Sequence, residues 1–308
     1  MIWFLLSLGA AVTQATQFAV VKGRGREIPP LVIVTWTQLV AFLAWLLFFA
    51  LPGARFVAPG DAWPAVAVSV VLVIGMTGLL TRASARGDIS IVGPVFALSP
   101  VFTVLPDFLL SHTVPNALGG LGLALAVAGT VSLSGGAAGT LNMGATRHTG
   151  APPARRTPIA PLRAIFARRD ARDALGAAVL LGFLAAIDRW AALSIGPPSY
   201  LLCSHAATGV VAGMLVLVTT PRSLVTSITR RNLVTLVGHG LLGVTGTGMQ
   251  TTALTVAPAA YVNAIRRMSA VIAVVLGGTL FREADTGRRL VAALLACAGA
   301  ACLLLAHQ

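Results

Sequence analysis

The segment TGLLTRA at residues 77–83 returns as TGMQTTA at residues 247–253, with four of seven positions identical after a shift of 170 residues. Without a gap, the same shift aligns Ser99, Val101 and Val104 with Ser269, Val271 and Val274, and Ala128-Gly129 with Ala298-Gly299. In all, 14 of the 59 aligned positions from 77 to 135 are identical. In an apolar chain, glycine and threonine match by chance less often than alanine and leucine. We therefore interpret the shift as an internal duplication.

Composition indicates a membrane protein. Of the 308 residues, 56% are hydrophobic and 10% are charged, too few charges to cover the surface of a water-soluble domain. The net charge of +13 would suggest nucleic-acid binding in a soluble protein, but here the arginines separate apolar runs, so we expect no nucleic-acid partner. The apolar run from Ile2 to Val21 follows no basic segment, which predicts a first span rather than a cleaved leader.

Ten apolar segments approach the length of about 20 residues that a helix needs to cross a bilayer. They are Ile2–Val21, Leu31–Leu51, Trp63–Thr81, Ile89–Leu110, Leu118–Leu133, Ala174–Ile195, Tyr200–Thr219, Leu233–Leu254, Ala260–Phe281 and Leu290–Ala306. An open sheet cannot face lipid, and the runs lack the alternation of a barrel. We therefore expect an all-α membrane protein with ten transmembrane helices.

The arginines predict the orientation of these spans. Five connections, alternating along the chain, hold 18 of the 22 basic residues, so the positive-inside rule makes them cytoplasmic and puts both termini outside. The first half carries its bases in its first and third connections, and the second half in its second and fourth. Related halves with reversed charge bias insert in opposite directions. We expect two inverted five-helix repeats, residues 1–135 and 174–308, joined by a flexible basic linker at 136–173.

Several paired features carry a family resemblance. Lys22 and Pro30 lie eight positions apart after the first span, as do Arg189 and Pro197 in the second half, with Tyr200 close behind. Gly87-Asp88-Ile89-Ser90 and Ser99-Pro100-Val101 in the fourth span correspond to Ala259-Ala260-Tyr261 and Ser269-Ala270-Val271 in the ninth, which ends in Phe281-Arg282-Glu283. This ordered, duplicated set resembles the drug/metabolite transporter superfamily, in its ten-span EamA-like branch.

The resemblance implies a secondary transporter that exports a small metabolite or drug-like compound through a path between the halves. It covers nearly the whole chain outside the linker. The first half departs from the family in having Ser111-His112-Thr113 where an acidic signature is expected. The second span carries Thr35-Trp36-Thr37-Gln38 in place of the family's frequent arginine.

Two adjacent arginines, Arg266 and Arg267, lie six to seven residues into the ninth span. A charge at this depth is costly unless it is paired or hydrated. One interpretation is a clamp for a carboxylate or phosphate, since a guanidinium offers bidentate donors, with Asn263 on the same face. The other is that both side chains snorkel to headgroups. Because successive helical residues point about 100° apart, we expect at most one to face a central cavity.

Three titratable groups are candidates for coupling to protons. Asp188 suits this role because burial favours the protonated carboxyl, although a helix-end charge at the interface is an equal alternative. Asp107 follows the kink residue Pro106 and faces either the cavity or the interface. His239, like His205, is a proton relay or, more commonly for a lone intramembrane histidine, a helix–helix hydrogen bond.

The remaining candidates for substrate contacts are amides and aromatic residues. Gln14 and Gln17 share a face of the first span, and Gln250 lies in the eighth; each lines a cavity or bonds helices together. Trp36 faces the cavity or lipid. Tyr261 is included as part of the Ala259-Ala260-Tyr261 motif, which the resemblance places at the start of the ninth span.

Nothing in the chain indicates enzyme chemistry, a cofactor or a metal site, since it lacks a phosphate-binding glycine loop and any His/Glu/Cys cluster. We expect a transporter of the bacterial inner (plasma) membrane, working by alternating access on an amino acid-like zwitterionic or anionic metabolite, or on an amphipathic drug-like compound. Its partners would be this metabolite, membrane lipids and possible coupling protons, and the chain would act as a monomer or weak homodimer. The alternative is a membrane-embedded enzyme or scaffold for lipid-linked substrates that does not transport.

Overall fold

The computed structural model describes residues 1–24, 28–86, 95–96, 98–112, 115–129, 169–221, 229–269, 272, 294–295, 298–303 and 305–306. Its labelled helices are α1 (Ile2–Arg24), α2 (Pro30–Phe49), η1 (Gly60–Ala62), α3 (Trp63–Arg86), α5 (Ser99–Ser111), α8 (Arg169–Ile195), α9 (Pro197–Thr219), α11 (Arg230–Leu254) and α12 (Ala259–Arg267). A further apolar helix occupies Ala117–Gly129. No strand occurs in these ranges, which confirms the expected all-α class.

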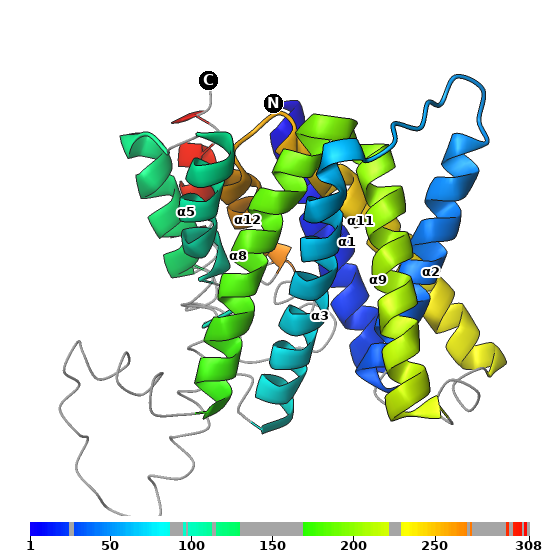
Figure 1. Cartoon of the computed structure of the whole chain (residues 1–308). Coiled ribbons are helices and arrows are strands. Elements are labelled where there is room, and N and C mark those ends of the chain that lie inside the picture. Colours follow the sequence, from blue (N-terminus) through cyan, green and yellow to red (C-terminus); the bar gives the residue numbers. More distant parts are fainter. Residues whose placement is uncertain are drawn as a thin grey trace, which may run out of the picture.

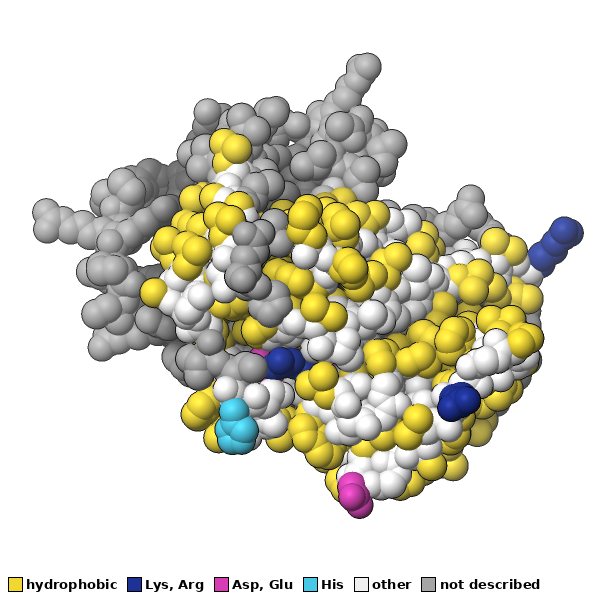
Figure 2. All heavy atoms as spheres, turned by 90° about the horizontal axis from the view of Figure 1, so that it is seen from above, with side chains coloured by type: hydrophobic (Ala, Val, Ile, Leu, Met, Phe, Trp, Pro, Cys, Tyr) yellow, Lys and Arg dark blue, Asp and Glu magenta, His cyan; other side chains and the backbone are white. Residues whose placement is uncertain are grey.

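Four helices in the described part of the chain are long and apolar enough to cross a bilayer: Pro30–Phe49, Gly60–Ala83, Arg169–Ile195 and Pro197–Thr219. Their outer faces suit lipid, since Val71 on α3 is 69% exposed and Val218 on α9 is 82% exposed. Seen from one end in Figure 2, hydrophobic side chains spread over the surface with few charged ones between them. The protein is therefore a multi-pass membrane protein, while the count of ten spans stays a prediction.

Proline and glycine set the ends of several helices. α2 and α9 each begin with a proline, Pro30 and Pro197, whose fixed φ suits the first helical position. Gly196, at φ +80°, separates α8 from α9 in a conformation that costs glycine little. α8 reaches at least five residues before the predicted start at Ala174, since Arg169 and Asp170 are helical.

The helices repeat with the same spacing as the sequence. Moved 170 positions along the chain, α1 falls within α8, α2 falls within α9, and α3 overlaps α11. The packing repeats as well: α1 packs against α11, its counterpart α8 packs against α3, and α2 packs against its own counterpart α9. In Figure 1, α1 runs downward from the N-terminus while α8 runs upward from the opposite end. The first helices of the two halves are thus antiparallel.

Small residues allow the closest helix crossings. A Cβ at Gly122 would lie 2.9 Å from the carbonyl oxygen of Gly299, on the segment that packs against this helix. A Cβ at Gly182 on α8 would lie 2.7 Å from the backbone of Phe102 on α5. Around these crossings the largest buried cluster joins α12 to the start of α1, through residues such as Trp3, Tyr261 and Ile265.

Candidate functional site

The two arginines of α12 occupy its last turn, where the partial negative charge of the helix C-terminus favours a cation. Their side chains diverge. The Arg266 guanidinium donates through Nη1 to Oε1 of Gln250 on α11. The guanidinium carbon of Arg267 lies 5.1 Å from the ring centroid of Phe96, in a cation–π arrangement, and Arg267 is only 7% exposed.

Neither arginine is neutralised by a carboxylate among the described residues. No described Asp or Glu lies within 4.0 Å of either guanidinium, and the buried Nε atoms of both have no hydrogen-bond partner there. The nearby Asn263 donates from Nδ2 to Thr103 Oγ1 at 2.9 Å, which leaves its Oδ1 without a described donor. Buried donors without acceptors are costly. The end of α12 therefore presents two cations suited to an anion.

Asp188 on α8 lies within electrostatic range of Arg266 but is held elsewhere. Its Oδ1 accepts a 2.5 Å hydrogen bond from the hydroxyl of Tyr200, a buried residue at the start of α9. The site thus combines positive groups on α12 with one carboxylate on α8. A zwitterion carries the complementary pair of charges.

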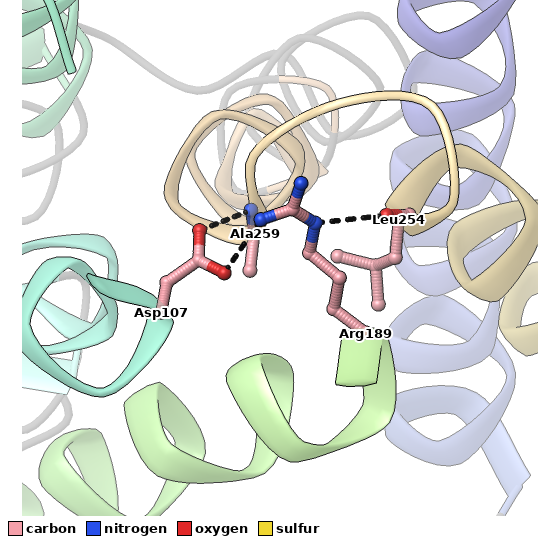
Figure 3. Close-up of polar contacts among 4 residues, drawn as sticks. All are labelled: Asp107, Arg189, Leu254 and Ala259. Atoms are coloured by element: carbon pink, nitrogen blue, oxygen red, sulfur yellow. Dashed lines mark hydrogen bonds and ion pairs between the residues drawn. The ribbon is translucent and has the colours of Figure 1, made fainter. Parts of the chain in front are cut away.

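Asp107 is fully occupied by structural contacts (Figure 3). Its Oδ1 accepts from Arg189 Nη1 at 2.8 Å, and its Oδ2 accepts from the backbone N–H of Ala259 at 2.8 Å. Arg189 also donates from Nε to the carbonyl of Leu254 at 3.2 Å. This buried ion pair joins α5 and α8 to both sides of the α11–α12 connection. We assign it to holding that connection rather than to proton coupling.

Two histidines hydrogen-bond to neighbouring helices. His239 Nδ1 on α11 lies 2.9 Å from Thr37 Oγ1 on α2, and the His239 carbonyl accepts from Gln17 Nε2 on α1 at 3.0 Å. His205 on α9 bonds through Nδ1 to Gln38 Oε1 on α2 and lies 3.4 Å from Thr247 Oγ1 through Nε2. Consecutive residues of α2 therefore contact both histidines.

Comparison with known proteins agrees with this architecture. Residues 1–135 match the model of the EamA-like transporter family. This match over residues 1–135 bears out the resemblance expected from the duplicated motifs and indicates a membrane transporter of the drug/metabolite type. A solved structure titled "Crystal structure of protein" superposes with a TM-score of 0.75 at 16% identity, covering 98% of this chain and 97% of that chain, which shows a shared fold. No curated protein matches.

Within this EamA-like chain, only part of the predicted substrate set lies near the arginines. Gln250 contacts Arg266, Asn263 precedes it on α12, and Gln14 Oε1 accepts from Ser269 Oγ at 3.4 Å, just beyond that helix. Tyr261 packs instead in the apolar cluster with Trp3, their ring centroids 6.4 Å apart.

Two further candidates also lie apart from the arginines. Gln17 is bonded at His239, and Trp36 packs against the apolar cluster that includes Val32 and Leu236. The polar residues around Arg266 and Arg267 on α12, the α12 group, are thus separate from a second set of polar contacts, which α2 makes with His205 and His239.

Several partners could not be named from the sequence. The partner of Arg189 is one, although an acid and a base in two different spans is the signal that would have suggested the Asp107–Arg189 pair. Thr37 and Thr103 gave no signal, because threonine is common in spans and bonds its own helix backbone.

Proposed function

We propose that the chain is a secondary active transporter that exports a small zwitterionic or anionic metabolite, such as an amino acid, across the cytoplasmic membrane by alternating access. Its two inverted repeats would be residues 1–135 and 174–308, with residues 136–173 as a linker whose last residues start α8. One chain supplies both halves of the path, so a monomer suffices.

One observation supports the substrate class above all others: the cation pair at the end of α12 has no carboxylate partner among the described residues. A carboxylate accepts two hydrogen bonds from a guanidinium and would satisfy the unused donors of Arg266 or Arg267. The ammonium of the same zwitterion would then face Asp188, which already lies in the field of Arg266. Gln250 and Asn263 would orient the carboxylate from α11 and α12.

The exchange of packing partners between the halves supports alternating access. The α1–α11 and α8–α3 pairs are counterparts. Closing one end of the transport path and opening the other would therefore replace one of these interfaces by the other, similar one, and would need no new kind of interface. Asp188 and His239 are the proposed coupling groups. The Asp107–Arg189 pair would stabilise the α11–α12 connection in the conformation described.

Transport into inverted membrane vesicles tests this function, with the substrate first chosen by thermal-shift screening of the purified chain against amino acids and other small anions. Loss of one charge-assisted hydrogen bond costs about 1.5–3 kcal/mol. Arg266→Gln and Arg267→Gln should therefore each lower uptake by about tenfold or more, while leaving expression unchanged. Arg55→Gln, on an exposed loop residue, is the matched control. Undiminished uptake in both α12 variants would reject the anion site while leaving the family and fold intact.

A further inference from the structure

A cavity of about 610 Å³ lies between the start of α2, the second half of α3 and the end of α9. Apolar side chains, including Leu31, Ile74 and Leu215, form much of its lining. Among the described residues, its polar lining consists of threonines and of Arg82, whose side chain is exposed. No residue of the α12 site contributes to it.

The same position in the other half of the molecule is closed. The 170-residue shift carries Gly78 to Gly248 and Leu215 to Trp45. A Cβ at Gly78 would meet no atom within 4 Å, whereas a Cβ at Gly248 would lie 3.2 Å from the Trp45 ring. Thr81 lines the open cavity, while its counterpart Thr251 is only 3% exposed.

Trp45 fills this second position by packing against a buried cluster that includes Tyr200 and Leu201. These two residues are the counterparts of Pro30 and Leu31, which line the open cavity. One indole ring is therefore enough to close this type of three-helix junction. The fold does not require the cavity at Leu215 to be open.

The cavity is placed to receive a molecule from the bilayer. α2 and α3 do not pack extensively against one another, and each packs against α9, so the cavity is a slot between two helices backed by a third. It lies at the ends of α2, α3 and α9 that join connections expected to be cytoplasmic. In sequence, Lys22, Arg24 and Arg26 precede α2, Arg86 ends α3 and Arg222 follows α9, against two acidic residues, Glu27 and Asp88.

We propose that this cavity binds one anionic phospholipid, with an acyl chain between α2 and α3 and the phosphate on Arg82. The volume lies within the range of about 300–1,000 Å³ that is usual for ligand cavities with apolar walls and few polar groups. Guanidinium groups bind phosphate through paired donors, and basic pockets between helices on the cytoplasmic side recognise anionic headgroups. The described part of the lining holds no amide or carboxylate, which distinguishes it from the α12 group, whose polar residues suit a small polar solute.

Native mass spectrometry of the full chain, incubated with phosphatidylglycerol or phosphatidylcholine, tests the proposal. The wild type should retain one phosphatidylglycerol in preference to phosphatidylcholine. Leu215→Trp introduces into the open half the residue that closes the other half, and it should reduce retention of both lipids about tenfold. Leu217→Trp, on an exposed position of the same helix, is the control and should bind like the wild type.

The charge is tested separately. Arg82→Gln should remove the preference for phosphatidylglycerol and leave phosphatidylcholine binding unchanged, whereas Arg55→Gln should alter neither. Gly78→Leu fills the cavity from α3 and provides a second blocking variant if Leu215→Trp does not fold. Full phosphatidylglycerol retention by a folded blocking variant, or an unchanged lipid preference in Arg82→Gln, would overturn the proposal. The proposal would also be overturned if the transported solute displaced the lipid and did so equally well in Arg82→Gln.

Discussion

Arg189 and Asp107 form a 2.8 Å ion pair between α8 and α5, and together they bond both ends of the connection between α11 and α12. The side chains are 11% and 2% exposed, so water screens the pair little. The pair thus fixes the start of the helix that carries Asn263, Arg266 and Arg267.

Removing one member of this pair should destabilise the fold strongly. Asp107→Ala leaves the Arg189 charge buried and the Ala259 N–H without its acceptor, and similar losses cost about 3–5 kcal/mol. We expect a matching drop in the free energy of unfolding, measured by chemical unfolding in detergent. The double variant Asp107→Asn/Arg189→Gln buries no lone charge and should lose less. A single variant as stable as the wild type would contradict this role.

The crossing at Gly122 should not accept a methyl group. Gly122→Ala would place its Cβ 2.9 Å from the backbone of Gly299 and Leu303, and such overpacking costs about 1–3 kcal/mol. Gly120→Ala, two residues earlier on the same helix, points into open space and should be neutral or slightly stabilising. Thermal unfolding of the two variants compares them directly; equal melting temperatures would rule out a tight crossing.

Trp45 should control access to its own end of the molecule. In a background without Cys203, Cys297 and Cys302, Trp45→Leu should make a cysteine at Thr251 react several-fold faster with a membrane-impermeant thiol reagent, because it recreates the open junction found at Leu215. A cysteine at the exposed Thr252 should react equally in both backgrounds. Unchanged labelling at position 251 would mean that other side chains keep this junction shut.

Asp188 should couple transport to protons. Asp188→Asn keeps the hydrogen bond from Tyr200 but removes the titrating group, so uptake driven by a pH gradient should be lost. Exchange of labelled for unlabelled substrate should persist at a higher substrate concentration, because the substrate ammonium loses its carboxylate partner. Asp61→Asn, on an exposed residue of η1, is the control. Persistence of gradient-driven uptake would transfer the coupling role to His239.

Sequence periodicity and apolar length predicted the helices well where runs of about 20 apolar residues exist. The predicted spans from Ile2 to Thr81 and from Ala174 to Leu254 each coincide with a helix to within a few residues. The 170-residue shift carried over to the packing of helix pairs, since α1 packs against α11 as α8 packs against α3. The segments expected as the ninth and tenth spans extend beyond the described residues.

The buried ionisable residues could be singled out one by one from the sequence, but their contacts could not. Burial cost alone singled out Arg266, Asp188 and Asp107. Which of them are paired depends on helix rotation and on contacts across more than 80 residues of sequence, as between Asp107 and Arg189. Tyr261 was grouped with Arg266 and Arg267 because of its place in the ninth span, yet at the start of α12 its ring packs against Trp3 and away from them.

α2 and α9 are counterparts in the two halves, and they pack against each other. Exchanging the two halves therefore leaves this contact in the same place. In the proposed alternating-access cycle this contact would therefore be the pivot, where displacement is smallest while the outer helices move furthest. A Cβ at Gly209 would lie 3.4 Å from Gln38 and a Cβ at Gly213 would lie 3.6 Å from Thr35, so α9 packs against α2 at van der Waals distance along this contact. A compound bound at this contact would block both conformational steps of the proposed cycle, whereas a compound bound at either opening of the path would block only one of them.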